Sequence, residues 1–311
     1  ITKTPRKFYL ALCYDPEGSF FFEELCKQPE YYLSRIERKI LLRESESIIN
    51  IANPAHIIDL GCGNMKKTQA LIHEASKKGD VHVHACDFDK DIISTAKNNL
   101  EKFYYDRLTV KEYNSCFEEC IDIFGPHKSQ KLFLFLGSTF GNLAIDDQKS
   151  LFLSLSNNMR KSDYFIIGVD LLKNEKILEA AYNDSGGYQE KSVMQMLVNC
   201  NREYGAEFDL RNFEHVSRYE PERRCVVSYL RSKCDQDVRV NAWDITLNLK
   251  EGEEIEAEIR EKFVLSEILE FIQSFGLRPV KIEVDDEIPY ALLLFSGPKE
   301  NVPTEGEAEG E

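Results

Sequence analysis

The sequence predicts an α/β fold in which a mainly parallel sheet is interrupted by an inserted α+β segment. Between residues 56 and 169, short apolar runs that resemble strands alternate with segments of helical periodicity. After residue 174 this alternation breaks, and it resumes only after residue 260. Strands that alternate with helices usually lie parallel to one another, so the sheet is expected to be covered by helices on both faces.

The first part of the chain leads into this alternation. Residues 1–34 are rich in aromatic side chains without strand periodicity, so we expect helices and a lid-like loop there. Apolar residues then recur at helical spacing from Ser34 to Ile51, which predicts a helix. Strands are expected at His56–Leu60, Val81–Ala85, Leu108–Lys111, Lys131–Leu136 and Tyr164–Val169. Helices are expected near Lys66–Lys78, Asp89–Phe103, Cys116–Phe124 and Asp146–Arg160.

The inserted segment begins with helical patterns and continues with antiparallel-type runs at Arg224–Leu230, Val238–Leu249 and Glu254–Ile259. A helix near Ser266–Phe275 follows, and then strands at Pro279–Val284 and Ala291–Phe295. The link between these two strands is too short for a crossover helix, so they must pair antiparallel.

These patterns predict two domains and a tail. Residues 35–173 with 261–297 form the first domain, and residues 1–34 with 174–260 form the second. Residues 298–311 are acidic without apolar periodicity, which predicts a disordered tail. The length of 311 residues agrees with two domains of about 150 residues each.

Composition limits the classes of partner. The formal net charge is -15 without a large basic cluster, which argues against nucleic acid and anionic membranes as partners. No apolar run reaches the length of about 18 residues that a membrane helix needs, and no signal peptide is recognisable. We expect a soluble, cytoplasmic protein, monomeric, with a small-molecule substrate.

Cysteine and histidine patterns do not predict a metal centre. The nine cysteines form no CxxC pair and are expected to be free thiols in a reducing compartment. His82 and His84 share one face of a predicted strand, where packing or hydrogen bonding is the usual role of histidine.

A glycine motif directly follows the first strand of the alternating part. The segment Asp59-Leu60-Gly61-Cys62-Gly63 lets the backbone turn and approach a ligand closely. A dinucleotide-binding loop would have a third glycine where Lys66 stands, which argues against a nicotinamide-linked oxidoreductase. Asp87 ends the second strand, where a carboxylate can accept hydrogen bonds from ribose hydroxyls. Together these features resemble the S-adenosylmethionine (SAM) site of Rossmann-like methyltransferases.

Longer stretches resemble the histidine-specific methyltransferase family, whose known members trimethylate the α-amine of histidine on the route to ergothioneine. The resemblance covers nearly the whole chain except the tail. It rests on residues 133–143 (FLFLGSTFGNL), 168–173 (GVDLLK), 181–184 (AYND), 201–203 (NRE), 208–210 (FDL) and 213–215 (FEH), with 7–9 (KFY) and 29–32 (PEYY) near the N-terminus.

This resemblance implies roles for individual residues. The cofactor site would be lined by Gly61, Gly63, Lys67, Asp87 and Gly137, with Phe117 near the adenine. Asn142 and Tyr182 would hold the substrate carboxylate, because an amide and a phenol supply donors without a second buried charge. Tyr9 and Tyr31 would lie near the amine, with Tyr31 or a bound water as the proton relay.

The sequence departs from the family at the side-chain pocket. Glu258 matches the glutamate that binds the imidazole, but Arg260 replaces the serine two residues later. Ser228 stands where the family has a methionine, and Cys116 stands where it has an acidic residue before Phe117. Residues two apart on a strand share a face, so Arg260 should lie beside Glu258 in the pocket and weaken selectivity for histidine. An exposed cross-strand charge pattern is the other interpretation of this pair.

Three functions follow as expectations. The first is SAM-dependent methylation of the α-amine of a free amino acid, with histidine as the first candidate. The second is the same chemistry on another amino acid or a tryptophan-derived amine. The third is a catalytically silent protein that binds SAM and a protein partner.

Overall fold

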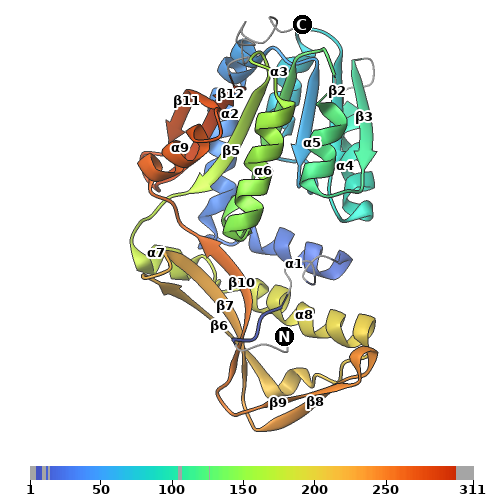
Figure 1. Cartoon of the computed structure of the whole chain (residues 1–311), viewed down its shortest axis with the longest axis vertical. Helices are drawn as coiled ribbons and strands as arrows, with labels where there is room; N and C mark the ends of the chain where they lie inside the picture. Colours follow the sequence, from blue (N-terminus) through green and yellow to red (C-terminus); the bar gives the residue numbers. More distant parts are fainter. Residues whose placement is uncertain (1–4, 9–11, 13–14, 104–106, 126, 299–311) are drawn as a thin grey trace, which may run out of the picture.

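A computed structural model describes residues 5–8, 12, 15–103, 107–125 and 127–298 (Figure 1). Tyr9 and residues 299–311, which make up nearly all of the predicted acidic tail, lie outside the described residues. No described helix has the length and apolar character needed to span a membrane. Every described cysteine is a free thiol.

A seven-stranded sheet forms the larger part of the molecule and confirms the predicted α/β class. Its order is β11-β12-β5-β4-β1-β2-β3. The strands are β1 (His56–Leu60), β2 (Val81–Cys86), β3 (Leu108–Tyr113), β4 (Lys131–Phe135), β5 (Tyr164–Asp170), β11 (Arg278–Val284) and β12 (Tyr290–Ser296). β1 to β5 pair in parallel, whereas β12 pairs antiparallel with both β5 and β11, as the short link predicted.

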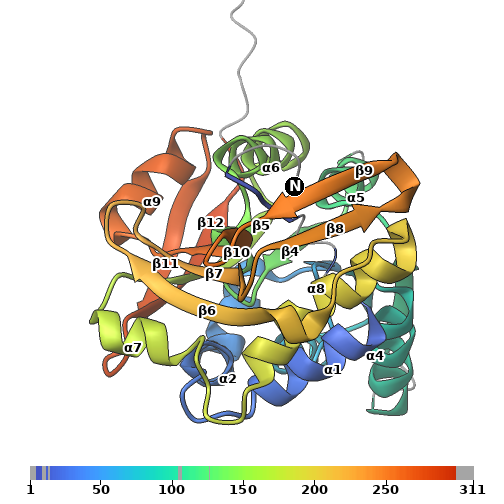
Figure 2. The same cartoon turned by 90° about the horizontal axis from the view of Figure 1, so that it is seen from below.

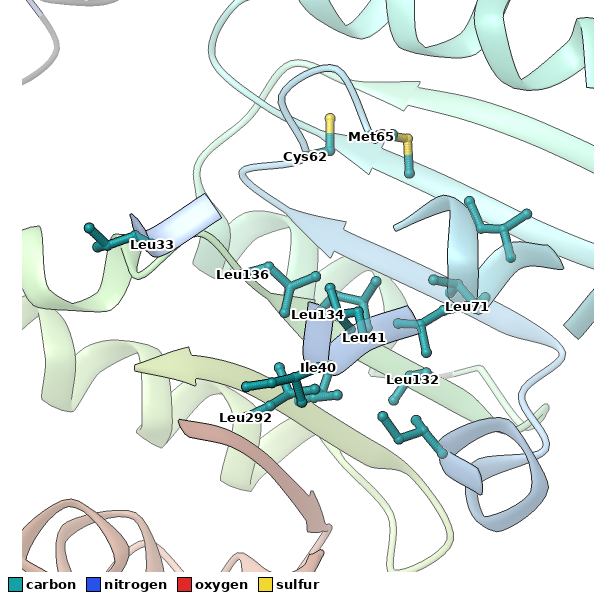
Figure 3. Packing of buried hydrophobic residues seen from close by; sticks show 14 of the residues in the cluster. Leu33, Ile40, Leu41, Cys62, Met65, Leu71, Leu132, Leu134, Leu136 and Leu292 are labelled. Atoms are coloured by element: carbon teal, nitrogen blue, oxygen red, sulfur yellow. The ribbon is translucent and has the colours of Figure 1, made fainter. Parts of the chain in front are cut away.

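Helices cover both faces of this sheet (Figure 1). They are α2 (Tyr32–Ala52), α3 (Gln69–Ser76), α4 (Lys90–Phe103), α5 (Phe117–Phe124), α6 (Ile145–Asn158) and α9 (Leu265–Gln273). β4 shows why both faces are apolar: Leu132 and Leu134 pack in the cluster that contains Leu41 of α2, as Figure 3 shows. Phe133 and Phe135 point to the opposite face and pack in the cluster that contains Phe152 of α6.

A smaller sheet of order β10-β7-β6 lies beyond one end of the large sheet, as Figures 1 and 2 show. It contains β6 (Phe213–Glu220), β7 (Cys225–Ser232) and β10 (Glu254–Glu261), and the hairpin β8 (Gln236–Val240) and β9 (Ile245–Leu249) projects from it. The remaining helices are α1 (Pro16–Leu25), α7 (Glu175–Ala180) and α8 (Tyr188–Tyr204). α1 packs along α8, and its N-terminus is capped by Asp15, which accepts a hydrogen bond from the Gly18 amide at 2.8 Å.

Two differences from the sequence prediction lie in this smaller sheet and in the hairpin that projects from it. β6 was not predicted, because its apolar residues Phe213, Val216 and Tyr219 are three apart, a spacing that does not show strand alternation. The predicted run Val238–Leu249 is divided by a short 3-10 turn, Asn241–Trp243. Asp244 after this turn adopts a left-handed backbone (φ 49°), which reverses the chain into β9.

Candidate active site

The glycine motif forms a turn between β1 and α3. Gly61 and Gly63 have φ values of 71° and 51°, in the region that glycine adopts without steric cost. The Asp87 carboxylate at the end of β2 accepts a hydrogen bond from the Gly63 amide at 2.9 Å. The structure therefore brings together the turn and the acidic residue that the sequence singled out.

Burial affects the two carboxylates near this turn. It raises the pKa of Asp87 against the opposing effect of the backbone amides that donate to it. Asp59 lies fully buried in β1, where burial raises its pKa to about 7 and the Thr68 hydroxyl donates to it. Asp87 is partly exposed and Asp59 is buried, so Asp87 is the carboxylate that a ligand can reach.

Lys67 and Gly137 meet at a buried carboxylate, Glu37, that no motif in the sequence indicated. Glu37 of α2 is ion-paired with Lys67 at 2.8 Å and accepts hydrogen bonds from the Gly137 amide at 2.7 and 2.9 Å. The Tyr290 hydroxyl donates to the same carboxylate at 2.7 Å. The sequence signal was available, because Glu37 lies at the spacing of four that places it on the apolar stripe of α2.

Two aromatic rings stand beside the glycine turn. Phe117 is the first residue of α5, and a side chain placed at Gly61 would lie 3.6 Å from its ring. Phe88, directly after Asp87, is 56% exposed and its ring centroid lies 6.0 Å from that of Phe117. One exposed and one half-buried aromatic ring next to the Asp87 carboxylate are suited to contact a flat heterocycle.

These features fit SAM. A side chain at Gly63 would meet no atom within 4 Å, so the turn has open space in front of it. Asp87 offers acceptors for hydroxyl groups. The Lys67 ammonium, already paired with Glu37, keeps 28% side-chain exposure beside it.

The segment after β4 carries residues from both predicted sites. Gly137 lies at its start and Asn142 ends the 3-10 turn Thr139–Asn142. Gly141 lets this turn approach β10, because a side chain there would lie 2.8 Å from the carbonyl oxygen of Glu261. Among the described residues, no hydrogen bond of the Asn142 amide side chain is found. The segment that follows β4 thus connects the predicted cofactor site with strand β10.

Tyr31 and Tyr182 lie edge to face with ring centroids 5.9 Å apart, and both are buried. The Tyr182 hydroxyl accepts a hydrogen bond from Lys262 at 2.9 Å. Burial is the main cause that raises the pKa of Tyr31 well above its usual range, and the neighbouring Tyr182 adds to this effect. The Tyr31 hydroxyl therefore keeps its proton near neutrality.

Glu258 and Arg260 point to the same side of β10. The Arg260 guanidinium donates to the Glu258 carboxylate and, at 3.1 Å, to the Ser228 hydroxyl. It also lies over the Tyr182 ring, 4.4 Å from the centroid. The pair is largely buried, with side-chain exposures of 12% for Arg260 and 8% for Glu258. This arrangement differs from an exposed cross-strand pattern.

The polar row continues across the smaller sheet. Gln189 of α8 donates to Glu258 at 2.8 Å. Ser228 exchanges a hydrogen bond with Ser217 of β6, whose hydroxyl lies 2.9 Å from Nε2 of His215. Burial lowers the pKa of His215 to about 4, so its imidazole is neutral at pH 7. A pocket of about 210 Å³ opens beside these groups, lined by Tyr182, Asn183, Asp184, Gly187, Gln189, Glu190 and His215.

Known proteins resemble this chain over most of its length. A family model described as a histidine-specific, SAM-dependent methyltransferase matches residues 1–296. A histidine N-alpha-methyltransferase of Mycobacterium tuberculosis (strain CDC 1551 / Oshkosh) is 30% identical over 94% of this chain and 91% of its own length. The protein of the same name from Mycolicibacterium smegmatis is also 30% identical, over 94% of this chain and 91% of its own length. The ergothioneine biosynthesis protein 1 of Schizosaccharomyces pombe is 30% identical over 72% of this chain and 30% of its own length.

The α/β sheet, the glycine turn with Asp87 and these matches agree with one another. The chain belongs to the family of histidine-specific, SAM-dependent methyltransferases.

Proposed function

We propose that this enzyme transfers the methyl group of SAM to the α-amine of L-histidine. The observation that carries the proposal is the chain of buried contacts that runs from Tyr31 to Tyr182, and from Tyr182 through Arg260 to Glu258. The relatives named histidine N-alpha-methyltransferase support this choice of substrate. In this proposal, Asn142 and Tyr182 bind the carboxylate, and Glu258 with Arg260 faces the side chain.

The residues of the cofactor side would hold SAM in the orientation needed for transfer. Asp87 would accept hydrogen bonds from the ribose, Phe117 would contact the adenine, and Lys67 and Gly137 would line the cofactor site. SAM supplies an electrophilic methyl group, so the protein needs to orient a neutral amine and exclude water. No nucleophilic side chain is required.

The proton of the α-amine must leave before attack, because a free α-amine is mostly protonated near neutrality. Tyr31 keeps its own proton, so it does not act as a phenolate base. The Tyr31 hydroxyl would instead act as a relay. Its oxygen would accept a proton from the α-ammonium group of the substrate while its own proton passes to a water molecule. Tyr9 belongs to the same proposal but lies outside the described residues.

The two predicted domains remain part of this proposal. Residues 35–173 with 261–297 would bind SAM, and residues 1–34 with 174–260 would bind the amino acid. The N-terminal residues support this division, because the Phe8 amide donates to the carbonyl of Glu256 in β10 at 2.9 Å. α1 also packs on α8 rather than standing alone.

Asn142→Ala tests the carboxylate site. We expect KM for histidine to rise about tenfold or more, because a lost hydrogen bond to a charged group is worth about 1.5–3 kcal/mol. SAM affinity should stay unchanged in calorimetry, because Asn142 is not placed against the cofactor. Asn248→Ala, an exposed asparagine on β9, is the matched control and should behave as the parent. If the parent uses histamine, which lacks the carboxylate, as well as histidine, this site is wrong.

A further inference from the structure

A buried charged cluster lies where the inserted segment leaves β5 and returns from β10, and the proposed reaction assigns it no role. The Asp170 carboxylate accepts a hydrogen bond from Tyr32 at 2.7 Å and is ion-paired with Lys262 at 2.9 Å and with Lys173. Lys173 and Lys262 have side-chain exposures of only 2% and 1%. The pKa of Lys262 is raised: burial opposes its charge, but Asp170 and Tyr182 together outweigh burial. Lys262 is therefore a permanent cation near neutrality.

Lys262 also fixes the hydrogen-bonding role of Tyr182. An ammonium group only donates, so the Tyr182 oxygen must be the acceptor of their 2.9 Å hydrogen bond. A phenol has a single proton, and that proton must then point away from Lys262. In the part of the chain that the structure describes, no acceptor is found for it. The Tyr182 hydroxyl is thus prepared to donate to a group that enters the pocket beside it.

The charge of the cluster favours an anion at that position. Two lysines face one aspartate, which leaves one positive charge in a buried region where electrostatic interactions are stronger than in water. The hydrogen bond from Lys262 polarises the Tyr182 hydroxyl. Its O–H is therefore a stronger donor to a group in the pocket, because hydrogen bonds in a chain strengthen one another. The Tyr182 ring itself is held by Arg260 on its face and Tyr31 at its edge.

We propose that Lys262 is a positioning residue that acts through Tyr182 and directs its O–H toward the carboxylate of the amino-acid substrate. The inference rests on the proposed function and deepens it. Lys262 would not touch the substrate, and its effect would be seen only with substrates that carry a carboxylate. Lys262 would thereby help to select amino acids over the corresponding amines.

The experiment is calorimetry of L-histidine and histamine with S-adenosylhomocysteine bound, on the full chain. Lys262→Met and Tyr182→Phe should each weaken histidine binding by about tenfold while histamine binding changes by less than about threefold. The double variant should be no weaker than the weaker single variant, because both changes remove one pathway. Lys262→Arg, which keeps the charge and the donors, should retain most of the affinity. Circular dichroism and SAM affinity check the fold.

Several results would overturn the inference. Equal weakening of histidine and histamine in Lys262→Met would show a structural role, and multiplied effects in the double variant would show independent actions. If Lys262→Met does not fold, the inference is tested with Tyr182→Phe and Lys262→Arg instead. A Tyr182→Phe variant that binds histidine like the parent contradicts the inference. A parent that methylates no histidine contradicts the proposed function instead. A parent that methylates histidine while Lys262→Met binds it normally contradicts the role of Lys262 alone.

Discussion

Glu37→Gln is expected to lower the free energy of unfolding by about 3 kcal/mol. The change removes the negative charge opposite Lys67 and leaves the Gly137 amide and Tyr290 hydroxyl with a poorer acceptor. The value is at the lower end for a broken buried ion pair, because Lys67 keeps 28% side-chain exposure. Chemical denaturation measures the difference. SAM affinity should fall in the same variant, since Lys67 and Gly137 both line the proposed cofactor site.

Glu283→Gln is the matched control for this variant. Glu283 is also ion-paired, with Arg43 at 2.9 Å, but the Arg43 side chain is 42% exposed. A surface pair of this kind contributes about 0–1 kcal/mol, and this variant should bind SAM like the parent. If both variants lost the same small amount of stability, Glu37 would not organise the cofactor side of the fold.

Arg260→Ser is expected to increase selectivity for histidine. The Glu258 carboxylate accepts hydrogen bonds from both Arg260 and Gln189, so an imidazole N–H must compete for it. Removing the guanidinium restores that acceptor, and one good hydrogen bond to a buried polar group is worth about 1–3 kcal/mol. The ratio of kcat/KM for histidine to kcat/KM for tryptophan should rise about tenfold or more. Initial rates with both amino acids give this ratio.

The control for this change is Arg231→Ser. Arg231 of β7 is ion-paired at 2.8 Å with Glu254, which lies on β10 like Glu258. The Arg231 side chain is 36% exposed and is not part of the proposed pocket. We expect this variant to keep the selectivity of the parent. If the parent already prefers histidine strongly and Arg260→Ser changes nothing, the guanidinium does not limit the access of the imidazole to Glu258.

Periodicity in the sequence predicted the large sheet well. Strand β4 shows why: its side chains are apolar on both faces, and such runs between helical segments are typical of buried parallel strands. The glycine turn and Asp87 were also recognisable, because both sit at the ends of predicted strands. β6 was not recognisable, because its apolar residues are three apart.

Contacts between segments far apart in the sequence could not be predicted from its periodicity. Glu37 and Lys67 come from different helical and loop segments, and nothing in their spacing pairs them. The same holds for Lys262 with Tyr182 and Asp170, which meet only because the insertion leaves and re-enters the large sheet at one place. The proximity of Arg260 to Glu258 was predictable, since it depends only on the repeat of two in a strand.

The product of the reaction tests the proposed function most directly. The purified chain is incubated with SAM and a mixture of free amino acids that includes L-histidine and L-tryptophan, and the amino acids are then examined by mass spectrometry. We expect methyl increments on histidine, located on the α-amine by fragmentation, and none on histamine added as a control. Methylation confined to another amino acid or amine, or the absence of any transfer by a protein that binds SAM, would contradict the proposed function.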